Sequence, residues 1–126
     1  MPFPIESKYI VECESNLQVQ FPESFKSKMI EMNGGVFKKG RRTFQLHPFF
    51  DKSSKKRVKR TCYHIGYETK KAHEWSGFPE DAVAIGSDGT GDLLVLRHDG
   101  DGILKDYIYL WNHETREARK IADSIL

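Results

Sequence analysis

The sequence predicts a single α+β domain, and three observations support this prediction. Two segments with apolar residues at helical spacing lie near the N-terminus. Farther along the chain, short apolar or alternating segments are separated by Gly-rich turns, as is typical of antiparallel strands. The chain has 126 residues, of which 38% are hydrophobic, and a chain of this size can bury a core without disulfides or metal. We therefore expect residues 1–126 to fold as one domain.

The first two elements are predicted to be helices. One runs from about residue 6 to about residue 17. A second begins at Pro22, because the first turn of a helix does not need the N–H group that proline lacks. It should end at residues 33–35, where Asn-Gly-Gly tolerates a left-handed backbone. The apolar residues at helical spacing are Tyr9, Ile10, Cys13 and Leu17 in the first helix and Phe25, Met29, Ile30 and Met32 in the second.

Most of the remaining segments are predicted to be strands. Two short alternating segments, 36–37 and 43–46, lie on either side of a basic turn. Three apolar or alternating runs at 82–85, 92–96 and 106–111 are separated by turns rich in Gly and Asp. We expect these three runs to form antiparallel strands joined by short loops.

Two segments have a less regular pattern. Between residues 55 and 74, one helix is expected, with Val58, Cys62, Ile65 and Thr69 on its apolar side. Cys13 and Cys62 are therefore both expected to be small buried core residues rather than reactive thiols. The C-terminal stretch has helical spacing at Ala118, Ile121, Ala122 and Ile125, although its length is marginal for a helix.

The net charge of +2 hides an uneven distribution of charge along the chain. Residues 1–37 contain 3 basic and 5 acidic side chains, residues 38–71 contain 12 and 2, and residues 72–126 contain 5 and 11. A basic middle segment therefore lies between two acidic ends, and the total charge says little about partners.

No motif for catalysis or for a cofactor is complete. Gly86 and Gly91 have the spacing of a phosphate-binding loop, but Asp92 occupies the position of its lysine. His73 and His113 each begin the HExxH zinc pattern, and in both cases the second histidine is missing. We therefore expect no cofactor, no metal ion and no enzymatic activity.

The chain is expected to be a soluble cytoplasmic protein with reduced thiols. Residues 1–6 contain neither a basic leader nor a long apolar region. Every apolar run is far shorter than the ~20 residues that a membrane span requires, so no membrane association is expected.

Four motifs follow one another along the chain: FPE at residues 21–23, MNGG at 32–35, GTGDLLVL at 89–96 and IYLWNHE at 108–114. In their order and spacing, they resemble the SUKH superfamily of Smi/Knr-type immunity proteins. The resemblance covers roughly residues 6–46 and 76–126. The segment 51–75 matches poorly, and we expect the variable part to be the basic segment, about residues 38–71.

The resemblance implies a mainly antiparallel sheet packed against helices. It also implies a strand at about residues 117–122, which conflicts with the helical spacing there, and a short final helix starting at Ser124. We follow the resemblance on both points. It further implies that the recurrent residues are turn, cap and packing positions and form no shared active site, namely Asn33, Gly34, Gly91, Asp92, Trp111 and His113.

The first functional hypothesis is the one that the resemblance implies. SUKH proteins are largely bacterial immunity proteins, encoded beside polymorphic or contact-dependent toxins, which bind and neutralise a cognate toxin. We expect a nuclease as the toxin and a monomer or weak homodimer as the immunity protein. A nuclease presents a cationic cleft to phosphate, and an acidic surface would mimic its substrate. The acidic residues expected in or beside the hairpin loops are Asp88, Asp92, Asp99, Asp101 and Asp106.

The second hypothesis is a module that binds nucleic acid or regulates through interaction, using the basic segment 52–60. Two tyrosines at positions 63 and 67 are available for stacking on bases. The acidic ends oppose this hypothesis because they repel phosphate, and nucleic acid is the less favoured partner. The same cations could instead bind an acidic patch on a toxin or on a second copy of the chain. The cations concerned are Lys52, Lys55, Lys56, Arg57, Lys59 and Arg60.

Overall fold

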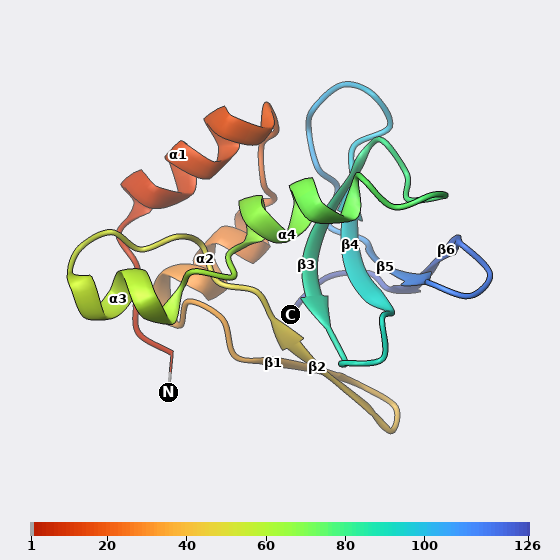
Figure 1. The fold of residues 1–126 in the computed structure, drawn as a ribbon, viewed down its shortest axis with the longest axis horizontal. Helices are drawn as coiled ribbons and strands as arrows, with labels where there is room; N and C mark the ends of the chain where they lie inside the picture. Colours follow the sequence, from red (N-terminus) through yellow and green to blue (C-terminus); the bar gives the residue numbers. More distant parts are fainter. Residues whose placement is uncertain (1) are drawn as a thin grey trace.

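The computed structural model describes residues 2–126 and contains one antiparallel sheet with helices packed on it. The helices are α1 (Ser7–Leu17), α2 (Glu23–Glu31), α3 (Lys55–Arg60) and α4 (Ile65–Ala72), and the strands are β1 (Val36–Lys39), β2 (Arg42–Leu46), β3 (Ala82–Ser87), β4 (Leu93–Arg97), β5 (Ile108–Asn112) and β6 (Glu117–Ala122). The order of the strands in the sheet is the order in the chain, from β1 to β6. Figure 1 shows α1, α2 and α3 on one side of the molecule and β3 to β6 on the other. The predicted α+β class is confirmed.

The two N-terminal helices form as predicted. In α1, Tyr9, Ile10 and Cys13 are buried, which confirms the apolar side of the first helix. In α2, Pro22 is the N-cap residue and Phe25 and Met29 are buried. The predicted apolar side of this helix is only partly correct, because Ile30 and Met32 are 40% and 41% exposed and the helix ends at Glu31. After α2, Gly34 and Gly35 have φ angles of 126° and 90°, so the backbone enters a region that only glycine adopts freely.

The sheet is buried on both faces at its centre. On one face, Val83, Ile85, Leu94 and Leu96 pack with α1 and α2 in the larger core cluster. On the other face, Ala82, Ala84, Leu93 and Val95 pack with Ala72, Phe78 and Trp111 in a smaller cluster. Burial on two faces explains why β3 and β4 are continuous apolar runs rather than alternating ones.

The sheet curls, so that its two edge strands approach each other. Phe37 of β1 and Ile121 of β6 pack against the same core and line one shallow depression. The strand over residues 117–122 is thereby confirmed, and the helical spacing in this stretch does not produce a helix. The expected final helix from Ser124 is wrong: residues 123–126 are not helical, and the Ser124 hydroxyl accepts from the backbone N–H of Leu126.

The single helix expected between residues 55 and 74 is also wrong. The segment forms α3 and α4 with a break between them. Thr61 closes α3, because its hydroxyl donates to the carbonyl of Arg57 and accepts from the backbone N–H of Asp51. His64 then caps α4 by accepting from the backbone N–H of Tyr67. Cys62 lies in the break and is exposed, contrary to the prediction that both thiols are buried.

The helices are 6 to 11 residues long. Within residues 2–126, none of them has the length and apolar character needed to cross a membrane.

Candidate partner-binding surfaces

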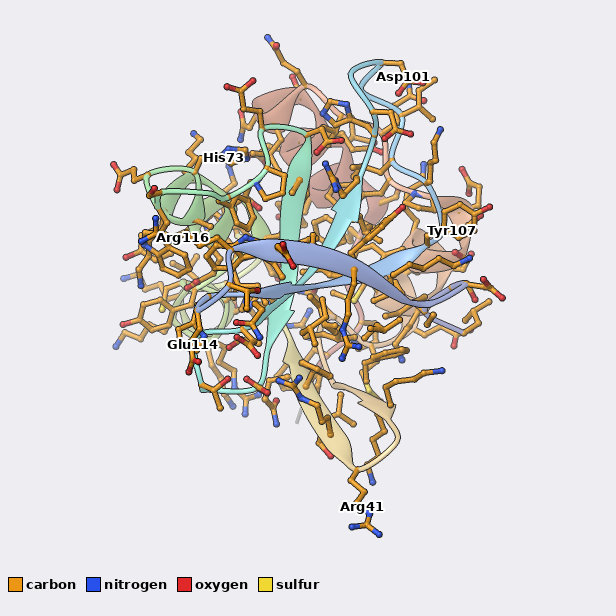
Figure 2. All side chains as sticks on the ribbon, turned by 90° about the vertical axis from the view of Figure 1, so that its right-hand side faces the viewer. Arg41, His73, Asp101, Tyr107, Glu114 and Arg116 are labelled. Carbon is orange, nitrogen blue, oxygen red and sulfur yellow. The ribbon has the colours of Figure 1, made fainter. Side chains whose placement is uncertain are left out.

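The connection between β4 and β5 carries three of the five aspartates predicted to bind a partner. Asp99, Asp101 and Asp106 are exposed on this loop. In Figure 2, Asp101 lies at one end of the molecule and Arg41 lies at the opposite end. These two charged residues therefore lie far apart on the molecule.

The loop is held in place by its own hydrogen bonds. The Nδ1 atom of His98 accepts from the backbone N–H groups of Gly100 and Gly102 at 2.9 and 3.1 Å. The Asp101 carboxylate accepts from the backbone N–H of Ile103 at 2.9 Å. The backbone of Gln20 binds the loop on both sides of Ile103. Its N–H donates to the carbonyl of Gly102, and its carbonyl accepts from the backbone N–H of residue 104. Asp101 is therefore presented on a fixed turn.

A groove of about 630 Å³ runs between this loop and the start of α2. Asp106 lines it and accepts a hydrogen bond of 2.6 Å from the hydroxyl of Ser24. Ile103 and Tyr107, which are 55% and 41% exposed, also line it. We define the acidic face as this groove with its loop, comprising Glu23, Asp99, Asp101, Ile103, Asp106, Tyr107 and Asp123.

Lysine side chains neutralise part of the negative charge of the acidic face. Asp123 pairs with Lys120 at 2.7 Å, and this hydrogen bond lowers the pKa of the Asp123 carboxyl. Glu23 pairs with Lys26, and Asp99 pairs with Lys105. Among residues 2–126, no cation pairs with Asp101 or Asp106. These two carboxylates are therefore the ones most available to a cationic partner.

Asp88 and Asp92 lie at the other end of β4 and are engaged within the chain. The Arg42 guanidinium contacts both carboxylates, at 3.2 Å for Asp92. Partial burial opposes ionisation of Asp88, but hydrogen bonds from Arg42 and Thr90 outweigh it and lower its pKa to about 2. The structure therefore divides the five predicted aspartates between two ends of the sheet.

Asp92 also fastens the turn between β5 and β6. It is 7% exposed, and its Oδ1 atom accepts from the backbone N–H and the Nδ1–H of His113, at 3.1 and 2.6 Å. Burial opposes ionisation of Asp92, while the hydrogen bonds from His113 and Arg42 lower its pKa. Gly91 makes this arrangement possible, because a Cβ atom there would lie 3.0 Å from the His113 ring. These motif residues hold turns together, as the resemblance implied.

The other motif residues also have structural contacts. The side chain of Asn33 donates to the carbonyl of Phe49 at 2.9 Å and accepts from its N–H at 2.7 Å. Trp111 is 2% exposed, and its indole N–H donates to the carbonyl of Gly77. These contacts join distant segments of the chain and leave neither side chain presented to a partner.

The predicted basic residues are found on and around α3, which has no buried residue. Arg57 pairs with the buried Asp51 at 3.5 Å, and the guanidinium groups of Arg57 and Arg60 lie over the ring of Phe3 at 4.6 and 4.8 Å. Lys52 pairs with Glu12 of α1. Part of the basic segment therefore serves to attach α3 to the rest of the fold.

The remaining lysines of α3 are free to meet a partner. Lys55, Lys56 and Lys59 are exposed, and in the part of the chain that the structure describes none has an ion-pair partner. We call these three lysines with Tyr63 and Tyr67 the basic face. Tyr63 is 66% exposed and Tyr67 is 44% exposed, so the aromatic side chains that the sequence singled out are available.

The structure adds residues that sequence reasoning missed. Glu23 and Asp123 join the acidic face from distant parts of the chain, and only the fold reveals their position. Ile103 and Tyr107 were detectable in part, because they are bulky residues in a loop that is otherwise polar apart from the buried Leu104. No cluster of three or more metal-ligating side chains occurs within residues 2–126.

The chain was compared with known protein families and with curated proteins. The family model described as the SMI1 / KNR4 family (SUKH-1) matches residues 4–125, which is nearly the whole chain and includes the basic segment. No curated protein matches the sequence.

Proposed function

Because this chain belongs to the SMI1 / KNR4 family (SUKH-1), we propose that it is an immunity protein that binds and neutralises a cognate toxin. Membership of the SUKH family is consistent with an immunity role and with a protein toxin as the partner. The proposal extends to a nuclease toxin of a polymorphic or contact-dependent system, acting in the cytoplasm. Neutralisation would occur by occlusion of the active site or of a surface next to it.

The observation that supports a nuclease is the acidic face. Asp101 and Asp106 have no cationic partner in the described chain and flank the exposed side chains of Ile103 and Tyr107. Charged groups around a bulky apolar centre are typical of protein interfaces, in which an aromatic or aliphatic anchor is surrounded by polar groups. A cationic nuclease cleft would be attracted by the carboxylates and would bury the two apolar side chains.

A fixed loop favours tight binding. The hydrogen bonds of His98, Asp101 and Gln20 hold the loop before any partner arrives, so little conformational entropy is lost on binding. Asp88 and Asp92 have no direct part in this proposal, because they are engaged by Arg42 and His113.

The test uses the toxin domain encoded beside the gene of this chain. The purified immunity protein should bind this domain in a titration calorimeter and should block its activity on DNA or RNA. Asp101→Lys with Asp106→Lys should weaken binding by about a hundredfold, because two attractive contacts become repulsive. The matched control is Glu114→Lys, an exposed residue that Figure 2 places away from Asp101 and Tyr107.

Two results would count against the proposal. If the wild-type protein neither binds nor inhibits the neighbouring toxin, then the immunity function is wrong. If it binds but the double substitution has no more effect than Glu114→Lys, then the acidic face is not the surface that contacts the toxin.

A further inference from the structure

A second concave site lies between α1 and α4, apart from the acidic face. Its volume is about 220 Å³. One wall is made by α1 residues that recur at helical spacing, and the other wall is made by α4 and the segment before it. The lining residues are Tyr9, Glu12, Cys13 and Asn16 from α1, with Phe50, His64, Gly66, Tyr67 and Lys70.

The base of this pocket is apolar and well packed. Cys13 is 9% exposed and lines the pocket together with Gly66. The ring of Phe50 stacks on His64 with a centroid distance of 4.5 Å and an interplanar angle of 15°. Gly66 leaves room for the ring of His64, the N-cap residue of α4, since a Cβ atom there would lie 3.3 Å from that ring.

The pocket is smaller than a typical small-molecule site. Sites for drug-sized ligands occupy roughly 300–1,000 Å³, whereas this pocket has about 220 Å³. Its size suits one bulky side chain inserted from a partner surface, which is how an interface anchor binds.

The surroundings of the pocket are cationic and aromatic. Lys70 lines the pocket, and Lys52 pairs with Glu12 at its rim. Tyr67 connects the pocket to the basic face, because its ring lies 5.8 Å from the ring of Tyr63 and 6.0 Å from the ammonium group of Lys71. The exposed lysines of α3 precede Tyr63 closely in the chain, since α3 ends at Arg60.

We propose that the α1/α4 pocket and the basic face form a second protein-binding surface, which takes an acidic segment of a partner and buries one bulky apolar side chain of that segment. The free lysines attract the acidic groups, and the pocket supplies the anchor point. A protein fits better than a nucleic acid, because the pocket is lined by the buried Cys13 and by the rings of Tyr9 and Phe50, which suit an apolar side chain better than a base with polar edges.

This surface does not depend on the proposed immunity function. The acidic face meets a cationic partner surface, whereas the basic face meets an acidic one. The acidic segment therefore differs in charge from the cationic surface that the acidic face would meet, and loss of binding at one face leaves the other measurable.

The experiment uses the full chain and fluorescein-labelled nine-residue peptides of Asp and Glu with either Trp or Ala at the centre. Fluorescence anisotropy should show that the Trp peptide binds at least about tenfold more tightly than the Ala peptide. Added salt should weaken both peptides, because the lysines are exposed. A Lys peptide with a central Trp should not bind this surface, so Asn16→Trp should leave any binding of that peptide to the acidic face unchanged.

Two variants locate the binding. Asn16→Trp should fill the pocket, so that the Trp peptide binds no more tightly than the Ala peptide. Ser15→Trp changes the neighbouring exposed position outside the pocket, and this variant should still bind the Trp peptide more tightly than the Ala peptide. Replacing Lys55, Lys56 and Lys59 with Glu should weaken both peptides by a similar factor. Lys105→Glu, on the acidic face, is the control for this charge change.

The proposal is overturned if the two acidic peptides bind equally or if neither binds at about 1 mM. Equal effects of Asn16→Trp and Ser15→Trp would also overturn it. A short oligothymidylate that binds the basic face more tightly than the Trp peptide would assign the surface to nucleic acid instead.

Discussion

The hydroxyl of Thr69 in α4 accepts a hydrogen bond of 2.9 Å from the backbone N–H of Ala84 in β3. One helical turn later, the Nε2–H of His73 donates to the carbonyl of Ala82, also at 2.9 Å. β2 pairs with only the last two residues of β3. The two side chains therefore supply hydrogen-bond partners to backbone groups of β3 in the part of its edge where no neighbouring strand pairs with it.

Thr69→Val should destabilise the protein by about 1–3 kcal/mol, because it leaves the N–H of Ala84 buried without an acceptor. Val has nearly the same shape as Thr, so packing is preserved. Urea denaturation followed by circular dichroism measures the change. Thr69→Ser, which keeps the hydroxyl, should recover part of the loss. The control is Thr43→Val on the exposed side of β2. A similar effect of both Val variants would show that α4 does not cap β3.

Acid should destabilise the protein through Asp88 and Asp92. The folded pKa of Asp88 is about 2, below its ordinary value of 3.8, and the pKa of Asp92 is also lowered. The unfolded chain therefore binds protons first as the pH falls. The stability that these ion pairs supply is fully present above pH 4 and is lost as the pH falls from about 4 to about 2.

Asp88→Asn should make the stability depend less on pH between pH 4 and pH 2, and it should lower the stability at pH 7. Guanidinium denaturation at a series of pH values measures both effects. Glu117→Gln, at an exposed position of β6, is the control and should keep the acid dependence of the wild type. If Asp88→Asn keeps the slope between pH 4 and pH 2, then the pair with Arg42 is not what depresses the pKa of Asp88.

The order of helices and strands could be predicted because its signals are local. Pro22 is the N-cap residue of α2, and Gly34 and Gly35 redirect the chain shortly after the helix ends, through the backbone preferences of these residue types. The strands β3 and β4 were detectable as apolar runs between Gly-rich turns. In each case the cause of the structure lies within a few residues of its effect.

The features that could not be predicted depend on contacts between distant residues. The break between α3 and α4 is stabilised by Thr61, whose hydroxyl bonds with Asp51, ten residues earlier. Helical spacing around Cys62 gave no sign of this contact. The C-terminal stretch has helical spacing as well, but pairing of β6 with β5 decides its conformation.

The candidate acidic site could be predicted only in part for the same reason. Aspartate favours turns, which correctly placed the five predicted residues in or near loops. However, Asp88 and Asp92 meet Arg42, which is 46 and 50 residues away, and only the fold brings that guanidinium to them. Asp101 and Asp106 have no such partner within residues 2–126, so the same residue type is left without an ion pair there.

His47 should make the stability fall between neutral and mildly acidic pH. Burial lowers the pKa of this side chain from 6.5 to about 4, and its Nε2 atom is buried with no hydrogen-bond partner within residues 2–126. The unfolded chain therefore takes up a proton that the folded chain does not, and stability is lost as the pH falls from about 6.5 to about 4. The loss is on the order of 3 kcal/mol.

His47→Phe should reduce this loss, because an aromatic ring of similar shape remains and the titrating group is gone. At pH 7.5, the variant should be at least as stable as the wild type, since the Nε2 atom forms no hydrogen bond to lose. Thermal unfolding between pH 7.5 and pH 4.5 measures the difference. An unchanged dependence on pH in this range would mean that another group is responsible.

The two thiols should react at very different rates. Burial, together with the nearby carboxylates of Glu14 and Glu12, raises the pKa of Cys13 to about 12, whereas Cys62 is exposed between α3 and α4. Because the thiolate is the reactive form, one equivalent of Ellman's reagent should react rapidly with the native protein and a second only after unfolding. Cys62→Ser should abolish the rapid phase. Two rapid equivalents in the native wild-type protein would show that the α1/α4 pocket opens to solvent and exposes Cys13.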